Sequence, residues 1–149
     1  MRHRIAAQAL LWMTLAVPLF VSIAGLAIDG GVLLASRRQL QSVADGAARA
    51  GATRLDLDRL RGSAGSDVQL DQPLALETSS AYLAERLPRE LAWPAAPVTH
   101  VDVGPRRVYV LIQGTLRTAF LRIVNIDHVA VEASAFADVQ TGIRASASR

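Results

Sequence analysis

The chain has 149 residues, 51% of them hydrophobic and 5% aromatic, and its formal net charge is +3. It contains no cysteine, so a disulfide framework is excluded. All sixteen basic residues are arginines, and their excess over acidic residues lies in residues 1–61. Residues 62–149 lack the basic stripe with interleaved aromatic side chains that is typical of nucleic-acid binding. We therefore expect no nucleic-acid partner.

Residues 5–28 form a stretch of twenty-four residues without a charged side chain. At about 1.5 Å per residue, even residues 9–28 would span a hydrocarbon core of roughly 30 Å as a helix. We predict a basic leader and transmembrane helix over residues 1–28, with Asp29 and Gly30 at the boundary of the span, and we expect the lipid bilayer as a partner. A cleaved secretory signal and a fully buried soluble helix are the alternatives that the sequence leaves open.

The charges that flank the apolar stretch favour one orientation. Arg2, His3, Arg4 and the amino group precede it, whereas Asp29 and the arginines at positions 37 and 38 follow it. Basic residues concentrate on the cytoplasmic side of a span. We therefore expect a single-pass protein of the bacterial inner membrane, with its N-terminus in the cytoplasm and its C-terminal module outside the cytoplasm.

An amphipathic helix is predicted to continue from the span over residues 29–61. Small residues repeat at helical spacing along one side of it, and such a side lets another backbone approach closely. The candidate helix-packing or assembly face consists of Leu33, Leu40, Ala44, Asp45, Ala47, Ala48, Gly51 and Ala52. It either binds a partner helix or packs on the chain's own domain. Asp45 is spaced to pair with Arg49, and Gly30–Gly31 is a candidate hinge.

A shorter helix is predicted after a linker. Residues 62–72 are rich in Gly, Ser and Asp, a composition typical of a linker. The helix is expected to begin near Pro73, a residue tolerated in the first turn, with Asp71 or Gln72 as its cap. Its expected core-facing leucines are Leu76, Leu83 and Leu87.

From residue 98 the hydrophobic period changes to two, which is typical of strands. Two such runs flank Gly104–Pro105, so we predict an antiparallel hairpin. A third strand is expected to present Val129, Val131, Ala133, Ala135 and Ala137 on one face. Residues 118–125, between the second and third strands, are expected to form a short helix with Phe120, Leu121 and Ile123 pointing inward.

These elements predict an α+β fold. A long N-terminal transmembrane helix continues into an amphipathic helix, and one or two short helices then pack on an antiparallel sheet of three or more strands. The small module spans residues 73–140, and a polar tail follows at 141–149. This arrangement is outwardly similar to a pilin, as an analogy of architecture alone.

No motif for chemistry stands out in the chain. His3, His100 and His128 lie in separate predicted elements and show no spacing typical of zinc ligands. The glycines near residue 62 cannot form a phosphate-binding P-loop, because that motif requires a lysine and the chain has none. We therefore expect no catalytic residue, metal, cofactor or small-molecule substrate, and we predict that the protein is not an enzyme.

Several spaced elements in the first third of the chain carry a family resemblance. They are Ala27-Ile28-Asp29-Gly30, Arg37-Arg38-Gln39-Leu40-Gln41, Ala44-Asp45-Gly46-Ala47-Ala48 and Ala50-Gly51-Ala52. With the preceding apolar span, this segment, residues 5–52, resembles the N-terminal part of Tad (tight adherence, Flp pilus) assembly proteins of the TadE/TadG type, most strongly the TadG-like form. Gly46 stands where that pattern has alanine.

The resemblance implies a function in the bacterial envelope. It implies a structural membrane protein of the Tad secretion system that takes part in Flp pilus assembly, with other Tad/Flp assembly proteins or further copies of itself as partners. The alternative is an exported envelope binding protein with a generic N-terminal anchor or a cleaved signal peptide. Asp29 and Asp45 are candidates for assembly contacts.

Overall fold

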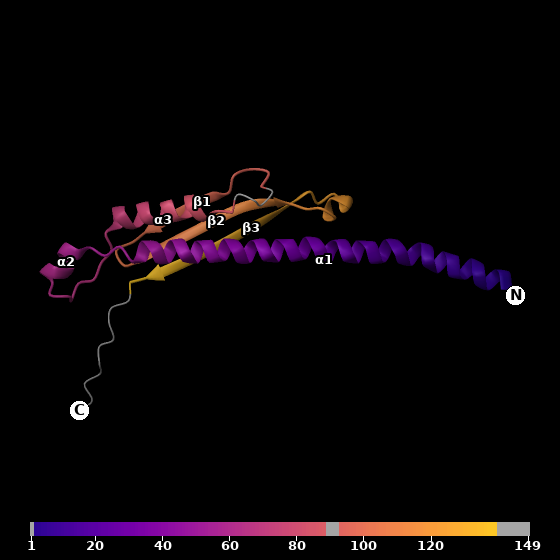
Figure 1. Cartoon of the computed structure of the whole chain (residues 1–149), viewed down its shortest axis with the longest axis horizontal. Helices are drawn as coiled ribbons and strands as arrows, with labels where there is room; N and C mark the ends of the chain where they lie inside the picture. Colours follow the sequence, from indigo (N-terminus) through magenta and orange to yellow (C-terminus); the bar gives the residue numbers. More distant parts are fainter. Residues whose placement is uncertain (1, 89–92, 140–149) are drawn as a thin grey trace, which may run out of the picture.

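A computed structural model describes residues 2–88 and 93–139 of the chain (Figure 1). Its elements are α1 (Arg2–Ala52), α2 (Leu57–Gly62), α3 (Gln72–Arg86), β1 (Val98–Val103), β2 (Arg107–Arg117), the 3-10 helix η1 (Leu121–Val124) and β3 (His128–Asp138). This confirms the predicted α+β fold. The polar tail expected at 141–149 lies outside the described residues.

The longest element, α1, is one uninterrupted helix of 51 residues with Pro18 in its interior. Two hydroxyl groups in its apolar half bond within the helix itself. Thr14 donates to the carbonyl of Leu10, and Ser22 donates to the carbonyl of Pro18, each over 2.8 Å. Because lipid offers no hydrogen-bond partner, internal acceptors of this kind make the polar side chains compatible with a span.

The sheet has the strand order β1-β2-β3, and both pairings are antiparallel. The predicted hairpin is confirmed: Val103 pairs with Val108 across a turn in which the Gly104 amide donates to the Arg107 carbonyl over 2.8 Å. At the same end, Arg107 forms a bidentate pair with Asp138 of β3, with N–O distances of 2.6 and 3.0 Å. The hydrogen bond from Arg107 favours the charged form of this carboxyl group, so the pKa of Asp138 is lowered.

One face of the sheet packs against α1 and α3, and the core lies between them (Figure 1). Burial alternates along β2 and β3, as the period of two predicts. The buried apolar residues are Leu40, Val43, Ala44, Ala47, Ala48, Leu70, Ala75, Leu83, Val108, Val110, Ile112, Leu116, Val131, Ala133 and Ala135. Side chains such as Tyr109 and Phe136 point to the opposite face and are exposed.

Small residues bring α1 and α3 into close contact. The buried Ser79 hydroxyl of α3 donates to the carbonyl of Ala47 in α1 over 3.1 Å. At Gly51 a Cβ atom would lie 3.1 Å from the Ala75 carbonyl oxygen and would overlap the Ser79 hydroxyl. The two backbones can approach this closely only because Gly51 has no side chain.

The structure confirms the second helix and its cap but corrects one of its core residues. The Asp71 carboxylate accepts a hydrogen bond from the Leu74 amide at the start of α3. Leu83 is buried as expected, whereas Leu76 is 45% exposed. The buried stripe of α3 instead contains Ala75 and Ser79, because the close approach of α1 leaves room only for small side chains.

The inward orientation expected for the short helix between β2 and β3 is wrong for Ile123. The helix itself exists as η1, but Ile123 is 78% exposed and Phe120 is 37% exposed. The sheet is already covered by α1 and α3, so η1 lies beyond the end of the core and has no interior to fill.

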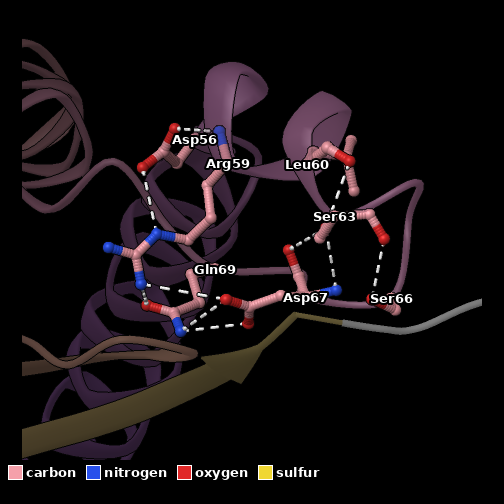
Figure 2. A network of polar contacts seen from close by, with 7 residues as sticks. All are labelled: Asp56, Arg59, Leu60, Ser63, Ser66, Asp67 and Gln69. Atoms are coloured by element: carbon pink, nitrogen blue, oxygen red, sulfur yellow. Dashed lines mark hydrogen bonds and ion pairs between the residues drawn. The ribbon is translucent and has the colours of Figure 1, made fainter.

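The segment after α2, predicted as a linker, is held by polar contacts (Figure 2). Arg59 donates to the side-chain oxygen of Gln69 over 2.9 Å and lies 3.7 and 3.8 Å from the carboxylates of Asp56 and Asp67. The Asp56 amide also donates to the Gln69 carbonyl over 2.9 Å. Residues 56 and 69, which flank α2 and the segment after it, therefore meet, and the chain enters α3 close to where it left α1.

We predict that Gly51→Ala destabilises the protein by about 1–3 kcal/mol, because the added methyl group overpacks the contact with α3. The comparison is Gly31→Ala on the same helix, where a Cβ atom meets nothing within 4 Å and alanine should be neutral or stabilising by up to about 1 kcal/mol. Thermal unfolding in detergent micelles, followed by near-ultraviolet circular dichroism, measures both. Equal melting temperatures for the two variants would contradict the close contact.

Candidate functional site at the junction of helix and sheet

The first half of α1 exposes its apolar side chains on all sides. More than half of the surface is exposed for each of Leu10, Trp12, Met13, Leu15, Val17, Leu19, Phe20, Val21, Ile23, Leu26 and Ile28. Within the described residues, only 11% of the most apolar window of this helix is buried by the rest of the chain. The alternative of a fully buried soluble helix is therefore wrong. By length and composition, α1 can cross a membrane.

Asp29 joins this apolar half to the module. The residue is only 4% exposed, and its carboxylate accepts hydrogen bonds from the amides of Ala119, Phe120 and Leu121, over 3.0, 2.9 and 2.6 Å. These amides lie at the start of η1, where helical N–H groups lack partners within their own helix. The η1 segment has no side-chain cap of its own. A residue ninety positions earlier in the chain therefore provides the missing acceptor.

A second contact lies one helical turn toward the N-terminus. A Cβ atom placed on Gly25 would come within 2.7 Å of the Cβ atom of Phe120, so the phenylalanine side chain lies directly on the glycine. The connection between β2 and β3, residues 118–127, thus rests on α1 at both Gly25 and Asp29. Figure 1 shows this connection, in orange, beside the middle of α1.

The two ends of the connection between β2 and β3 are hydrogen-bonded to each other. The Thr118 amide donates to the carbonyl of Asp127 over 3.1 Å, and the Thr118 hydroxyl donates to the carbonyl of Ile126. Asn125 adopts a left-handed conformation with φ 65°, which ends η1 and turns the chain back toward β3. The amides bound by Asp29 are therefore part of a compact turn.

Most of the candidate helix-packing face lies inside the chain's own core. Leu40, Ala44, Ala47 and Ala48 are fully buried and Gly51 is buried, while Leu33 and Ala52 pack at the edge of the core. The side chains that cover this face come from the sheet and from α3. Of the two interpretations left open for the small face, the one seen in this structure is packing on the chain's own domain.

The structure contradicts two further expectations for α1, an ion pair of Asp45 and a hinge at Gly30–Gly31. Asp45 accepts a hydrogen bond from Gln41 over 3.4 Å, and no ion pair between Asp45 and Arg49 is found among the described residues, so that predicted pairing is wrong. Gly30–Gly31 lies inside α1, and the module contacts the helix at Gly25 and Asp29 on one side of this pair and at the core residues on the other. The glycine pair therefore does not separate the span from the module.

The described residues offer little that resembles a reaction centre. They contain no group of three or more His, Asp or Glu side chains placed to hold a metal ion. His100 lies on β1, and His128 lies at the start of β3 beside a shallow depression of about 310 Å³ that Arg117, Thr118, Arg122 and Asp127 also line. This depression is open to solvent, and the hydroxyl of its buried residue Thr118 donates to the carbonyl of Ile126.

The sequence points to Asp29 by its position but does not reveal its partners. The three amides that it binds are backbone groups with no sequence signature, and Phe120 was expected in the interior. The one available signal was an aspartate directly after an apolar stretch, because a carboxylate in that position needs hydrogen bonds or water. The placement of Asp29 and Gly30 at the boundary of the span stays a prediction.

The first half of α1 is exposed and apolar, and the second half carries an α+β module with an antiparallel sheet. This architecture is typical of a membrane-attached protein. The comparison with known families agrees with this class. Residues 7–54 match the Tad family model, described as "Putative Flp pilus-assembly TadE/G-like". The match covers α1 from residue 7 to its end and the two residues that follow it, which confirms the resemblance found in the sequence. No curated protein and no solved structure matches the chain.

We predict that Asp29→Ala lowers the opening free energy of the Ala119, Phe120 and Leu121 amides by about 1.5–3 kcal/mol, the usual worth of hydrogen bonds to a charged group. Asp29→Asn should show a smaller effect because one oxygen acceptor remains. Hydrogen–deuterium exchange in detergent micelles gives the protection of these amides. Asp45→Ala is the matched control on the same helix, and protection in Asp29→Ala equal to that control would show that Asp29 does not hold the turn.

Proposed function

We propose that this protein is a non-enzymatic, single-pass membrane protein that takes part in assembling or anchoring a Tad/Flp pilus. The observation that carries the proposal is that the segment matched by the Tad family model is the same helix whose first half is exposed and apolar. The family match and the candidate membrane helix support a role in pilus assembly and membrane localisation. The matched description concerns assembly of a structure, which supports a structural function.

Contacts with partners follow from which surfaces the module leaves free. The small face of α1 after Asp29 is occupied by the sheet and α3, so partner helices would reach α1 through its exposed apolar half. Interfaces between membrane helices are formed by van der Waals packing of such surfaces. Other Tad/Flp assembly proteins, or further copies of this chain, are the proposed partners, and contacts to the module would add to those of the helix.

The contacts around Gly25 support retention of the helix over its removal as a signal peptide. The small residues that would suit a signal peptidase lie at 22–27, and cleavage there would remove or expose Gly25 next to Phe120. We propose that the N-terminus stays in the cytoplasm and that the module lies outside the inner membrane, since the basic leader favours that orientation.

The topology can be tested directly because the chain has no cysteine. In spheroplasts of the native bacterium, a membrane-impermeant maleimide should label Ala81→Cys, on the exposed side of α3, and should label His3→Cys only after lysis. The intact mass in carbonate-washed membranes should be that of the full chain. A shortened species in the soluble fraction, without residues near 1–27, would favour the exported binding protein.

Deletion of the gene should abolish or strongly reduce surface pili, and the wild-type chain should restore them. The informative variant replaces residues 8–24 by an unrelated apolar helix and keeps Gly25 and Asp29. If the helix makes specific contacts, this variant stays in the membrane but fails to restore pili, as counted by electron microscopy. Full restoration would show that the helix is a generic anchor, and normal pili in the deletion strain would refute the pilus function.

A further inference from the structure

The connection between β2 and β3 exposes three large apolar side chains. Ile123 is 78% exposed, Ile126 is 45% exposed and Phe120 is 37% exposed. They belong to one short turn, residues 118–127, that lies beyond the end of the core. A tight turn at the surface of a soluble domain is usually polar, so a concentration of apolar surface here needs a reason.

The position of this turn along α1 supplies the reason. Asp29 and Gly25 fix the turn to the helix, and these two contacts are four positions apart, about 6 Å at 1.5 Å per residue. The stretch without charged side chains ends at Ile28, so Gly25 belongs to it. The turn therefore lies at the same level as the last turn of the apolar helix.

We propose that this turn is a second membrane contact, in which Phe120, Ile123 and Ile126 enter the interfacial layer of the leaflet from which α1 emerges. The proposal rests on the membrane anchoring proposed above. If α1 crosses the bilayer up to Asp29, the turn cannot avoid the interface, because its backbone is tied to the helix there. The occupant of this apolar surface is lipid.

The neighbouring helix surface supports lipid over a protein partner. Leu26 and Ile28 of α1, at the same level as the turn, are also more than half exposed. The apolar side chains of the turn and of the helix thus lie at one height and face the same surroundings. Lipid that surrounds the last apolar turn of α1, at Leu26 and Ile28, therefore also surrounds the side chains of the connection.

The charges beside the apolar side chains fit the headgroup layer. Arg117 ends β2 and Arg122 lies in η1, both are exposed, and neither takes part in an ion pair within the described part of the chain. Together with His128 they line the depression of about 310 Å³, to which Asp127 adds one carboxylate. Arginines next to apolar side chains at a membrane surface can bind the phosphates of anionic lipids.

The absence of cysteine allows one probe to be placed at a time. Three single-cysteine variants of the full chain, Ile123→Cys, Phe20→Cys and Ala81→Cys, are labelled with the environment-sensitive fluorophore NBD. Each is reconstituted into vesicles of phosphatidylcholine and phosphatidylglycerol, with or without lipids that carry a quenching spin label near the headgroup or near the end of the acyl chain. All three positions are exposed, so the label should not disturb the fold.

The expected result is graded by depth. The probe at Phe20 should be quenched most by the deep spin label, the probe at Ile123 most by the label near the headgroup, and the probe at Ala81 by neither. The Ile123 emission should also shift to shorter wavelength than that of Ala81. If Phe20 is quenched but Ile123 behaves like Ala81, the second membrane contact is refuted while the anchor stands. If Phe20 is not quenched, the anchor itself fails, and the inference fails with it.

The contribution of the arginines is measured in the Ile123→Cys background. Removing phosphatidylglycerol, or combining Arg117→Gln with Arg122→Gln, should reduce the quenching by the shallow spin label. The matched control combines Arg61→Gln with Arg106→Gln, two exposed arginines at the other end of the module, and should leave the quenching unchanged. An equal loss of quenching in both double variants would show that total charge, and not this turn, is responsible.

Discussion

Three hydrogen bonds to the carboxylate of Asp29 connect the long helix to the sheet. A buried carboxylate costs free energy unless hydrogen bonds replace its hydration, and the amides at the start of η1 replace it here. The need is mutual, because those amides also lack partners within their own turn. The level at which the β2–β3 connection meets α1, and hence the orientation of the module on the helix, follows from this pairing and from the contact of Phe120 with Gly25.

The spacing of small residues in α1 is explained by the chain's own packing. Alanines at 44, 47 and 48 are fully buried, and glycine at 51 allows the contact with Ser79 of α3. The same argument accounts for the departure from the Tad pattern at position 46, because the ring of Tyr82 in α3 occupies the space that an alanine side chain would enter. The absence of a side chain at position 46 thus makes room for a residue outside the matched segment.

Much of the fold could be predicted because its signals are local. The uncharged stretch, the cap at Asp71 and the alternating valines of β2 each depend on neighbours in sequence. Asp29 could be placed but its partners could not, because backbone amides ninety residues away carry no sequence pattern. Leu76 and Ile123 were misplaced for a related reason: which side of a short helix faces inward depends on what already covers the sheet.

The contacts of α1 with the module extend over a long stretch of the helix. From Asp29 to Gly51 the helix extends about 33 Å at 1.5 Å per residue, and both ends of this segment contact other elements. A helix held at both ends, and packed in the core between them, moves with the module as one rigid element. A sideways pull on the membrane half therefore tilts the whole module as one body, and a pull along the helix axis loads the three Asp29 hydrogen bonds and the α1–α3 contact together, before any single loop can stretch.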